Sequence, residues 1–481
     1  MTLAGLGFAF FLPVVWLLYW ALPRRVLWQN SMLLLASYAF YATWDSKLLL
    51  LLWLSTLFDY GISLGLAKQK NTRLRKWLLL LSVVGNVGVL AVFKYLGFFL
   101  KSFSSLLGLV GLSGSSLVLD IALPLGISYI TLLKIGYIID VYYERVPVEK
   151  SLIHFALFVA FFPHLIAGPI VRARDMLPQY SKPRMLLPAD LQQGAGQFLI
   201  GFFMKAYVAE ILARFYVNPV FKSPESFNSF AHWIGLFAYA AQLFCDFAGY
   251  SLMAIGIAAL FGLQLPTNFN YPFLSRGMME FWRRWHITLN NWLFDYIYSP
   301  MITSQGWMRG RLGLGFLIIF ALSGLWHGPL WTFVLWGILH GFGLLIQYKW
   351  DLFYKSLCRK DRAYVAIRKS KSYQWLAWLI TQSFFLLTLL PFRTTSLEHT
   401  WAYLKGLVHG TGQLPTLGFH FFVCITFLVV YHLLALRIGS PWRDRFFNLP
   451  SPVRGFVYGV VIVFLALFMP VGMGTFIYAN F

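Results

Sequence analysis

The sequence predicts an all-α protein that crosses a membrane many times. Only 12% of its 481 residues are charged and 59% are hydrophobic, whereas soluble domains carry roughly 25% charged residues. The mean hydropathy of +0.67 agrees with this. Such a chain has too little polar surface to fold as a water-soluble globule. Apolar runs of about 20 residues, the length that crosses a bilayer as a helix, recur along the whole chain.

The apolar runs give the expected spans in chain order. The first, 3–22, has no basic segment before it and no A-x-A site after it, so it is predicted to be a retained anchor. Further runs of spanning length are 28–44, 47–66, 77–100, 117–141, 194–213, 231–262, 375–392, 418–436 and 455–479. The uncharged stretch 312–348 is nearly two spans long, and Gly328 and Pro329 divide it. About a dozen membrane segments are therefore expected.

Two stretches differ from plain spans. In 151–171 a helix must break, because the apolar run contains His154, Pro163, His164, Gly168 and Pro169. Broken backbone at membrane depth is tolerated only inside protein or beside a cavity. The stretch 278–300 mixes Trp, Phe and Tyr with charged residues, which favours an interfacial or funnel-lining helix.

The net charge of +22, from 39 basic and 17 acidic residues, indicates topology. The basic residues lie in short gaps between apolar runs, which is typical of cytoplasmic loops and argues against nucleic-acid binding. The loops predicted to be cytoplasmic are 24–25, 68–76, 349–371 and 437–454. Alternation of the spans then places both chain ends on the outer face of the membrane.

Signatures of several other classes are missing from the sequence. It contains no GxxxxGK[ST] phosphate loop and no HExxH. The three cysteines, Cys245, Cys358 and Cys424, are far apart and form no CxxC pair, so neither a disulfide framework nor a zinc site is indicated. Ionisable groups within apolar runs become the candidates, because burying one in a membrane is costly.

His327 is the sharpest candidate. It lies in SGLWHGPLW, near the middle of the long uncharged stretch. An imidazole titrates near neutrality, so it can take a proton from an attacking hydroxyl without a metal. Trp326 and Gly328 on either side would give a substrate an apolar wall and close backbone approach. The alternative is a buried histidine that is hydrogen-bonded to a neighbouring helix.

A second cluster lies in FWRRWHITLNNW, around His286. Arg283 and Arg284 could bind phosphate, because guanidinium groups match phosphate oxygens; the alternative is anchoring at the membrane interface. The other candidate substrate contacts in this cluster are Trp285, Thr288, Asn290 and Asn291.

Two further polar residues stand within apolar runs. Asp246, in QLFCDFAGYS, is a candidate substrate contact, and it could also pair with a basic group or a histidine that the sequence does not identify. His340 follows His327 by thirteen residues and falls on a different helix face, so it is interpreted as structural.

Five blocks in order carry a family resemblance. They are FFPHLIAGPIVRARDMLPQ (161–179), QLFCDFAGYSLMAIGIAALFG (242–262), PTNFNYPF (266–273), FWRRWHITLNNWLFDYIY (281–298) and GLWHGPLWTFVLWGILHG (324–341). Together they resemble the membrane-bound O-acyltransferase superfamily (MBOAT), in particular the bacterial alginate O-acetyltransferase (AlgI-like) branch. DFAGYSL is closer to the D-alanyl-transfer (DltB) branch. Leu252 replaces an acid frequent in the alginate branch, and SPMITSQGWMRGR replaces its GGNR-type loop.

The resemblance implies a fold and residue roles. The fold is a ring of transmembrane and re-entrant helices around a central funnel, in a single membrane domain over 1–481. Its parts would be N-terminal helices in 1–145, a catalytic core in 150–350 and C-terminal helices in 372–481. The family's catalytic histidine falls on His327 and its second histidine on His286, with Thr288 in the small hydroxyl position.

The resemblance also implies a function. Such proteins take an acyl group from a cytoplasmic thioester and pass it outward, and an exported enzyme usually completes transfer to a polysaccharide. We expect an O-acyltransferase of the bacterial inner membrane that uses acetyl-CoA for a cell-envelope acceptor such as alginate, another exopolysaccharide or peptidoglycan. D-alanyl transfer to teichoic acid is the alternative, and a transporter or a non-catalytic export scaffold belongs to other classes. His327 would be the general base, or a transient acyl carrier.

Two supporting roles remain open between candidates. His286, Asn290 or Asn291 would supply the oxyanion donor that attack on a thioester carbonyl needs. Arg283, Arg284 and the basic cytoplasmic loops would contact the phosphates of coenzyme A. No permanently bound cofactor or metal is expected.

Overall fold

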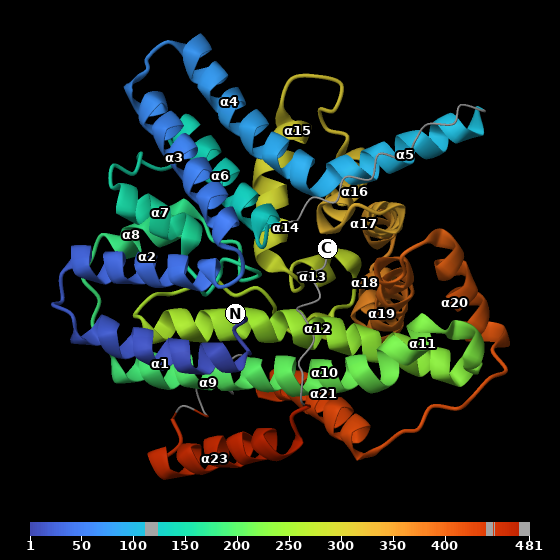
Figure 1. The fold of residues 1–481 in the computed structure, drawn as a ribbon. Coiled ribbons are helices and arrows are strands. Elements are labelled where there is room, and N and C mark those ends of the chain that lie inside the picture. Colours follow the sequence, from blue (N-terminus) through green and yellow to red (C-terminus); the bar gives the residue numbers. More distant parts are fainter. Residues whose placement is uncertain (111–123, 439–445, 447, 471–481) are drawn as a thin grey trace. The chain divides into compact units, whose positions relative to one another are not determined.

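The computed structural model describes residues 1–110, 124–438, 446 and 448–470 (Figure 1). These residues are mostly helical, and within them β pairing consists of two isolated bridges, Phe227 with Gln413 and Asn228 with Thr411. The prediction of an all-α polytopic protein is confirmed. The chain groups into two compact units. Unit 1 contains Met1–Phe198 and Ser251–Pro266, and unit 2 contains Leu199–Tyr250 and the described chain from 267 onward.

Unit 1 holds the N-terminal helices. They are α1 (Leu6–Ala21), α2 (Val26–Ala42), α3 (Ser46–Lys68), α4 (Thr72–Leu90), η1 (Ala91–Tyr95), α5 (Leu96–Leu109), α6 (Ile127–Tyr142), α7 (Leu152–Ala160), α8 (Ala173–Tyr180) and most of α9 (Pro188–Phe202). The end of the long helix α12 (Ser229–Leu260) also belongs to it.

Unit 2 begins near the end of α9 and includes the first two thirds of α12. Its short early elements are η2 (Phe203–Ala209), α10 (Glu210–Leu212), η3 (Ala213–Val217), α11 (Asn218–Lys222) and η4 (Pro224–Ser226). After α12 come η5 (Pro272–Leu274), α13 (Met278–Trp282), α14 (Ile287–Leu293), η6 (Phe294–Tyr298), α15 (Ser299–Thr303), α16 (Leu312–His327), α17 (Trp331–Lys360), α18 (Ala363–Lys369), α19 (Lys371–Arg393), α20 (Leu397–His409), α21 (Phe419–Ile438) and α23 (Ser451–Phe468).

Several helices are long and apolar enough to cross a membrane. Within the described residues, six stretches qualify: Ser46–Lys68, Thr72–Leu109, Ser229–Leu260, Trp331–Lys360, Lys371–Arg393 and Ser451–Phe468. Shorter apolar helices are Leu6–Ala21, Leu312–His327 and Phe419–Leu434. Part of the expected span 117–141 and the end of 455–479 lie outside the described residues. The chain is therefore a multi-pass membrane protein.

The predicted break in 151–171 is confirmed. Helix α7 ends at Ala160, and the chain continues without a helix until α8. A Cβ at Gly168 would overlap the backbone of His164, so this tight turn requires glycine. The broken segment is buried: the ring of Phe162 lies 6.1 Å from that of Phe8 and 5.8 Å from that of Phe40.

The stretch 278–300 differs from the single interfacial helix that its composition favours. It forms the separate short elements α13, α14, η6 and the start of α15. The chain leaves the helical path at 283–286, where His286 has a φ of 45° in the left-handed region. His286 is the N-cap of α14, and its left-handed conformation separates α14 from α13.

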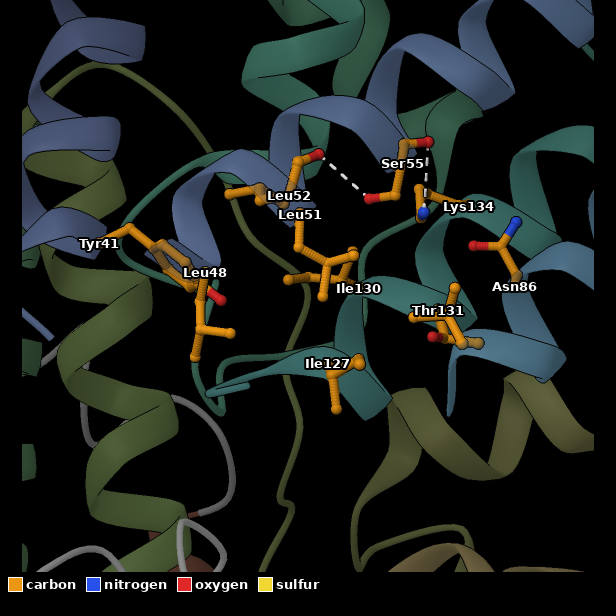
Figure 2. A pocket seen from close by; sticks show the side chains of 11 residues that line it. Tyr41, Leu48, Leu51, Leu52, Ser55, Asn86, Ile127, Ile130, Thr131 and Lys134 are labelled. Carbon is orange, nitrogen blue, oxygen red and sulfur yellow. Dashed lines mark hydrogen bonds between the residues drawn. The ribbon is translucent and has the colours of Figure 1, made fainter. Parts of the chain in front are cut away.

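Unit 1 contains a buried ion pair between two helices. Lys134 Nζ of α6 lies 3.2 Å from Asp59 Oδ2 of α3, and the two side chains are 3% and 0% exposed. Asn86 of α4 donates to both carboxylate oxygens. Lys134 also donates to the carbonyl oxygen of Ser55, at the edge of a cavity of about 20 Å³ (Figure 2). A cavity of that size has room for one water.

Replacing Lys134 with Met should destabilise the protein by roughly 3–5 kcal/mol, because the Asp59 carboxylate is then left buried without a counter-charge. The apparent melting temperature in detergent, followed by tryptophan fluorescence, measures this loss. The double variant Lys134→Met with Asp59→Asn should recover most of the stability. A double variant as unstable as the single one would contradict an energetic role for the ion pair.

Candidate active site

A helical hairpin in unit 2 positions His327. Helix α16 ends at His327, Gly328 and Pro329 interrupt the helix, and α17 starts at Trp331, as the sequence predicts. Glycines face the partner helix: a Cβ at Gly337 would overlap the carbonyl oxygen of Phe320, and a Cβ at Gly324 would overlap that of Phe333. Small residues of this kind let two membrane helices approach closely. The position of His327 is therefore set by direct backbone packing.

Aromatic rings surround His327, whose side chain is almost fully buried. Its ring centroid lies 5.0 Å from Trp326, 5.1 Å from Trp336 of α17 and 5.3 Å from Phe392 of α19. His327 is therefore the last residue of α16 and lies within an aromatic enclosure.

His286 lies near this hairpin. Its residue is 2% exposed, and its ring packs edge-on against Phe247 of α12, with centroids 4.6 Å apart. The ring of Trp326 lies 6.2 Å from that of His286. Trp326 therefore contacts the rings of both His286 and His327, and the two predicted catalytic histidines belong to one aromatic cluster.

Asn268, for which sequence reasoning proposed no role, holds His286. Its Oδ1 lies 3.1 Å from His286 Nδ1 and accepts from the hydroxyl and the backbone N–H of Thr288, at 2.8 and 3.3 Å. Asn268 is 1% exposed. It lies in PTNFNYPF, a block that carries the family resemblance, and this was the available signal.

Burial determines the protonation of His286, which lies outside the candidate membrane-spanning helices. Removal from water lowers the pKa of its imidazole to about 3, because the charged form loses its hydration. The ring is therefore neutral at physiological pH. Its Nε2 is buried and has no hydrogen-bond partner among the described residues.

Asp246, for which the sequence leaves a basic partner open, has one. Asp246 of α12 forms an ion pair with Lys205 of η2, and both side chains are at least nine-tenths buried. The pair joins two helical elements of unit 2. This contact gives Asp246 a structural environment; its assignment as a substrate contact stays a prediction.

The two arginines and two asparagines of the cluster lie in different surroundings. Arg283 is exposed, whereas Arg284 pairs with Glu280 at 2.8 Å and donates to the carbonyl of Asn270. The amide of Asn290 donates to the carbonyl oxygen of Trp282, at the end of α13. Asn291 is exposed. Of the three candidate oxyanion donors, His286 is the one whose ring adjoins Trp326.

The remaining predicted residues pack within unit 2. Trp285 is buried, and its ring stacks on Phe281 at 5.7 Å. His340 is buried beside Trp336, and its Nε2 lies 2.9 Å from the hydroxyl of Thr388 in α19. That bond matches its interpretation as a structural residue. Within the described ranges, no group of three or more His, Cys, Asp or Glu side chains is placed to hold a metal ion.

Several known proteins are similar in sequence to this chain. The model of the membrane-bound O-acyltransferase family matches residues 36–390. The probable alginate O-acetylase AlgI of Azotobacter vinelandii is 37% identical over 393 residues, which cover 81% of this chain and 74% of the relative. The peptidoglycan O-acetyltransferase of Helicobacter pylori is 36% identical, covering 83% and 78%. The teichoic acid D-alanyltransferase of Bacillus subtilis is 30% identical over a smaller region, covering 48% and 62%.

Proposed function

The chain belongs to the membrane-bound O-acyltransferase family, and from that premise we propose that it transfers acetyl groups from a cytoplasmic thioester towards hydroxyl groups of a cell-envelope polysaccharide. The observation that carries the proposal is the cluster of His327, Trp326 and His286, which lies inside the matched region. A buried imidazole in an aromatic surround suits proton transfer during acyl transfer.

The proposed step balances without a metal. His327 takes the proton of the acceptor hydroxyl, and the resulting oxygen attacks the thioester carbonyl. The new C–O bond forms, the C–S bond breaks, and the proton returns to the leaving thiolate. The products are an acetyl ester and a free thiol. An acyl-histidine intermediate at His327 is the variant of this scheme.

The proposed donor is acetyl-CoA, met from the cytoplasmic side. Arg283, which is exposed, is the better placed of the two arginines for a phosphate contact, because Arg284 already pairs with Glu280. The basic loops 24–25, 68–76, 349–371 and 437–454 would lie on the same side. Both chain ends would then lie on the outer face of a bacterial inner membrane.

The extent of the sequence alignments favours acetyl transfer over D-alanyl transfer. The two O-acetyltransferase relatives named above align over 81% and 83% of this chain, and the D-alanyltransferase of Bacillus subtilis aligns over 48%. The acceptor would be alginate, another exopolysaccharide or peptidoglycan. An exported acetyltransferase or esterase-like partner would complete the transfer outside the membrane.

An assay of the purified protein in liposomes distinguishes an O-acetyltransferase from the alternative functions. Acetyl-CoA labelled in the acetyl group should lose its label to water or to an added acceptor on incubation with the protein, and D-alanyl thioester should not. Turnover of the D-alanyl donor alone would favour the alternative acyl group. Turnover of neither donor would favour a transporter or a scaffold and would refute the proposal.

A further inference from the structure

We infer that Asn268 is a positioning residue that holds His286 in one tautomer, with the proton on Nδ1 and the lone pair on Nε2. The inference rests on the proposed function, because it assigns His286 its part in acyl transfer. It gives His286 the chemistry of a hydrogen-bond acceptor. The sequence left His286 open as an oxyanion donor.

The hydrogen bonds of Asn268 identify the atom that faces His286. The same Asn268 atom receives the backbone N–H of Thr288, which can only donate. This atom must therefore be the carbonyl oxygen Oδ1. If it were the amide nitrogen, two hydrogen-bond donors would face each other. An oxygen 3.1 Å from His286 Nδ1 requires Nδ1 to carry the hydrogen. A neutral ring with a proton on Nδ1 has none on Nε2.

The backbone holds the same two segments in register. His286 has a φ of 45°, a left-handed conformation that costs a non-glycine residue free energy and persists only where neighbours hold it. Two hydrogen bonds flank it: Ile287 N–H donates to Asn268 O at 2.9 Å, and Asn270 N–H donates to Arg284 O at 2.8 Å. The Asn268 side chain thus faces His286 across two hydrogen-bonded backbone segments. Because the fold fixes this arrangement, it also fixes the tautomer of His286.

Burial determines what Nε2 can do. The ring is enclosed by Phe247 and Phe269, and Nε2 has no partner among the described residues. An acceptor buried without a partner is unfavourable, and a substrate hydroxyl or thiol that donated to it would relieve that cost. His286 is therefore arranged to accept a hydrogen bond from an X–H group and so to orient it. It cannot donate to a developing oxyanion until it has first taken up a proton.

Variants at Asn268 test the inference through kinetics. Asn268→Ala should lower kcat by about 100-fold with little change in KM, because the ring loses its fixed tautomer while the substrate contacts remain. Asn268→Asp keeps an oxygen facing Nδ1 and should restore kcat to within about 10-fold at pH 8. The carboxylate raises the pKa of the neighbouring imidazole above the value of about 3 that burial gives it, so protonation of His286 should begin at a higher pH than in the natural protein.

Asn270→Ala is the matched control. Asn270 stands two residues along the same segment and is exposed, and it pairs with Arg284 through backbone atoms. Its variant should keep kcat and the pH profile of the natural protein. An Asn268→Ala variant with unchanged kcat would overturn the inference.

The tautomer itself can be read without any acyl transfer. In protein labelled with ¹⁵N-histidine, the solid-state NMR signals lost in His286→Gln identify His286. We expect a protonated Nδ1 and a bare Nε2 in the natural sequence, and loss of that single state in Asn268→Ala. A protonated Nε2 in the natural sequence, or the same tautomer in Asn268→Ala, would overturn the inference. Failure of the proposed function would instead appear as a normal tautomer with no turnover of acetyl-CoA.

Discussion

Replacing His327 with Gln should reduce acetyl transfer from acetyl-CoA by at least about 1,000-fold. Glutamine keeps a polar side chain of similar reach, but it cannot take a proton from the acceptor hydroxyl, and general-base catalysis contributes up to about 10⁴-fold. The aromatic rings of Trp326, Trp336 and Phe392 would still enclose the position. The loss should therefore appear in kcat, measured in liposomes with labelled acetyl-CoA.

His340→Gln provides the matched control for this variant. His340 is a second fully buried histidine in the same unit, in contact with Trp336 and hydrogen-bonded to Thr388. Its replacement should lower the melting temperature and leave the activity of the folded protein within about 10-fold. If His327→Gln is inserted, folds and retains activity, His327 is not the base. If both variants lose activity equally, the loss reports damage to the packing of the hairpin.

The comparison of these two histidines indicates what the sequence could predict. The helix break at Gly328 and Pro329 is a local property of the chain, so the end of α16 at His327 followed from residue types alone. Helix periodicity also separated His340 from His327. Both predictions depend only on residues that are close together in the sequence.

Asn268 and His286 illustrate the opposite case. They are eighteen residues apart, and their contact depends on a left-handed turn at His286 that no residue preference specifies. The same turn divides 278–300 into short helices where composition favoured one. The partner of Asp246 is more distant still, because Lys205 reaches it from another element. An unpaired charge in an apolar run can be recognised from sequence, but its partner is selected by tertiary packing.

The α16–α17 hairpin leads to the second large expected effect. Gly337→Val should lower acetyl transfer by more than about 100-fold and also destabilise the protein. A Cβ at this position overlaps the carbonyl oxygen of Phe320 and lies 3.2 Å from the Cα of Ala321, so backbone atoms must move. The helices can accommodate the side chain only by separating or sliding. Displacement of a catalytic group by 1 Å can cost about 100-fold in rate.

Gly88→Val makes the same chemical change in the membrane helix α4. A Cβ added at Gly88 meets no atom within 4 Å, so this variant should keep both its melting temperature and its activity. The pair of variants thus separates the cost of valine in a membrane helix from the cost of separating α16 and α17. Equal effects at Gly88 and Gly337 would contradict the hairpin argument. Loss at Gly337 alone would mean that close backbone packing positions His327, because the two sites differ in what the added side chain meets.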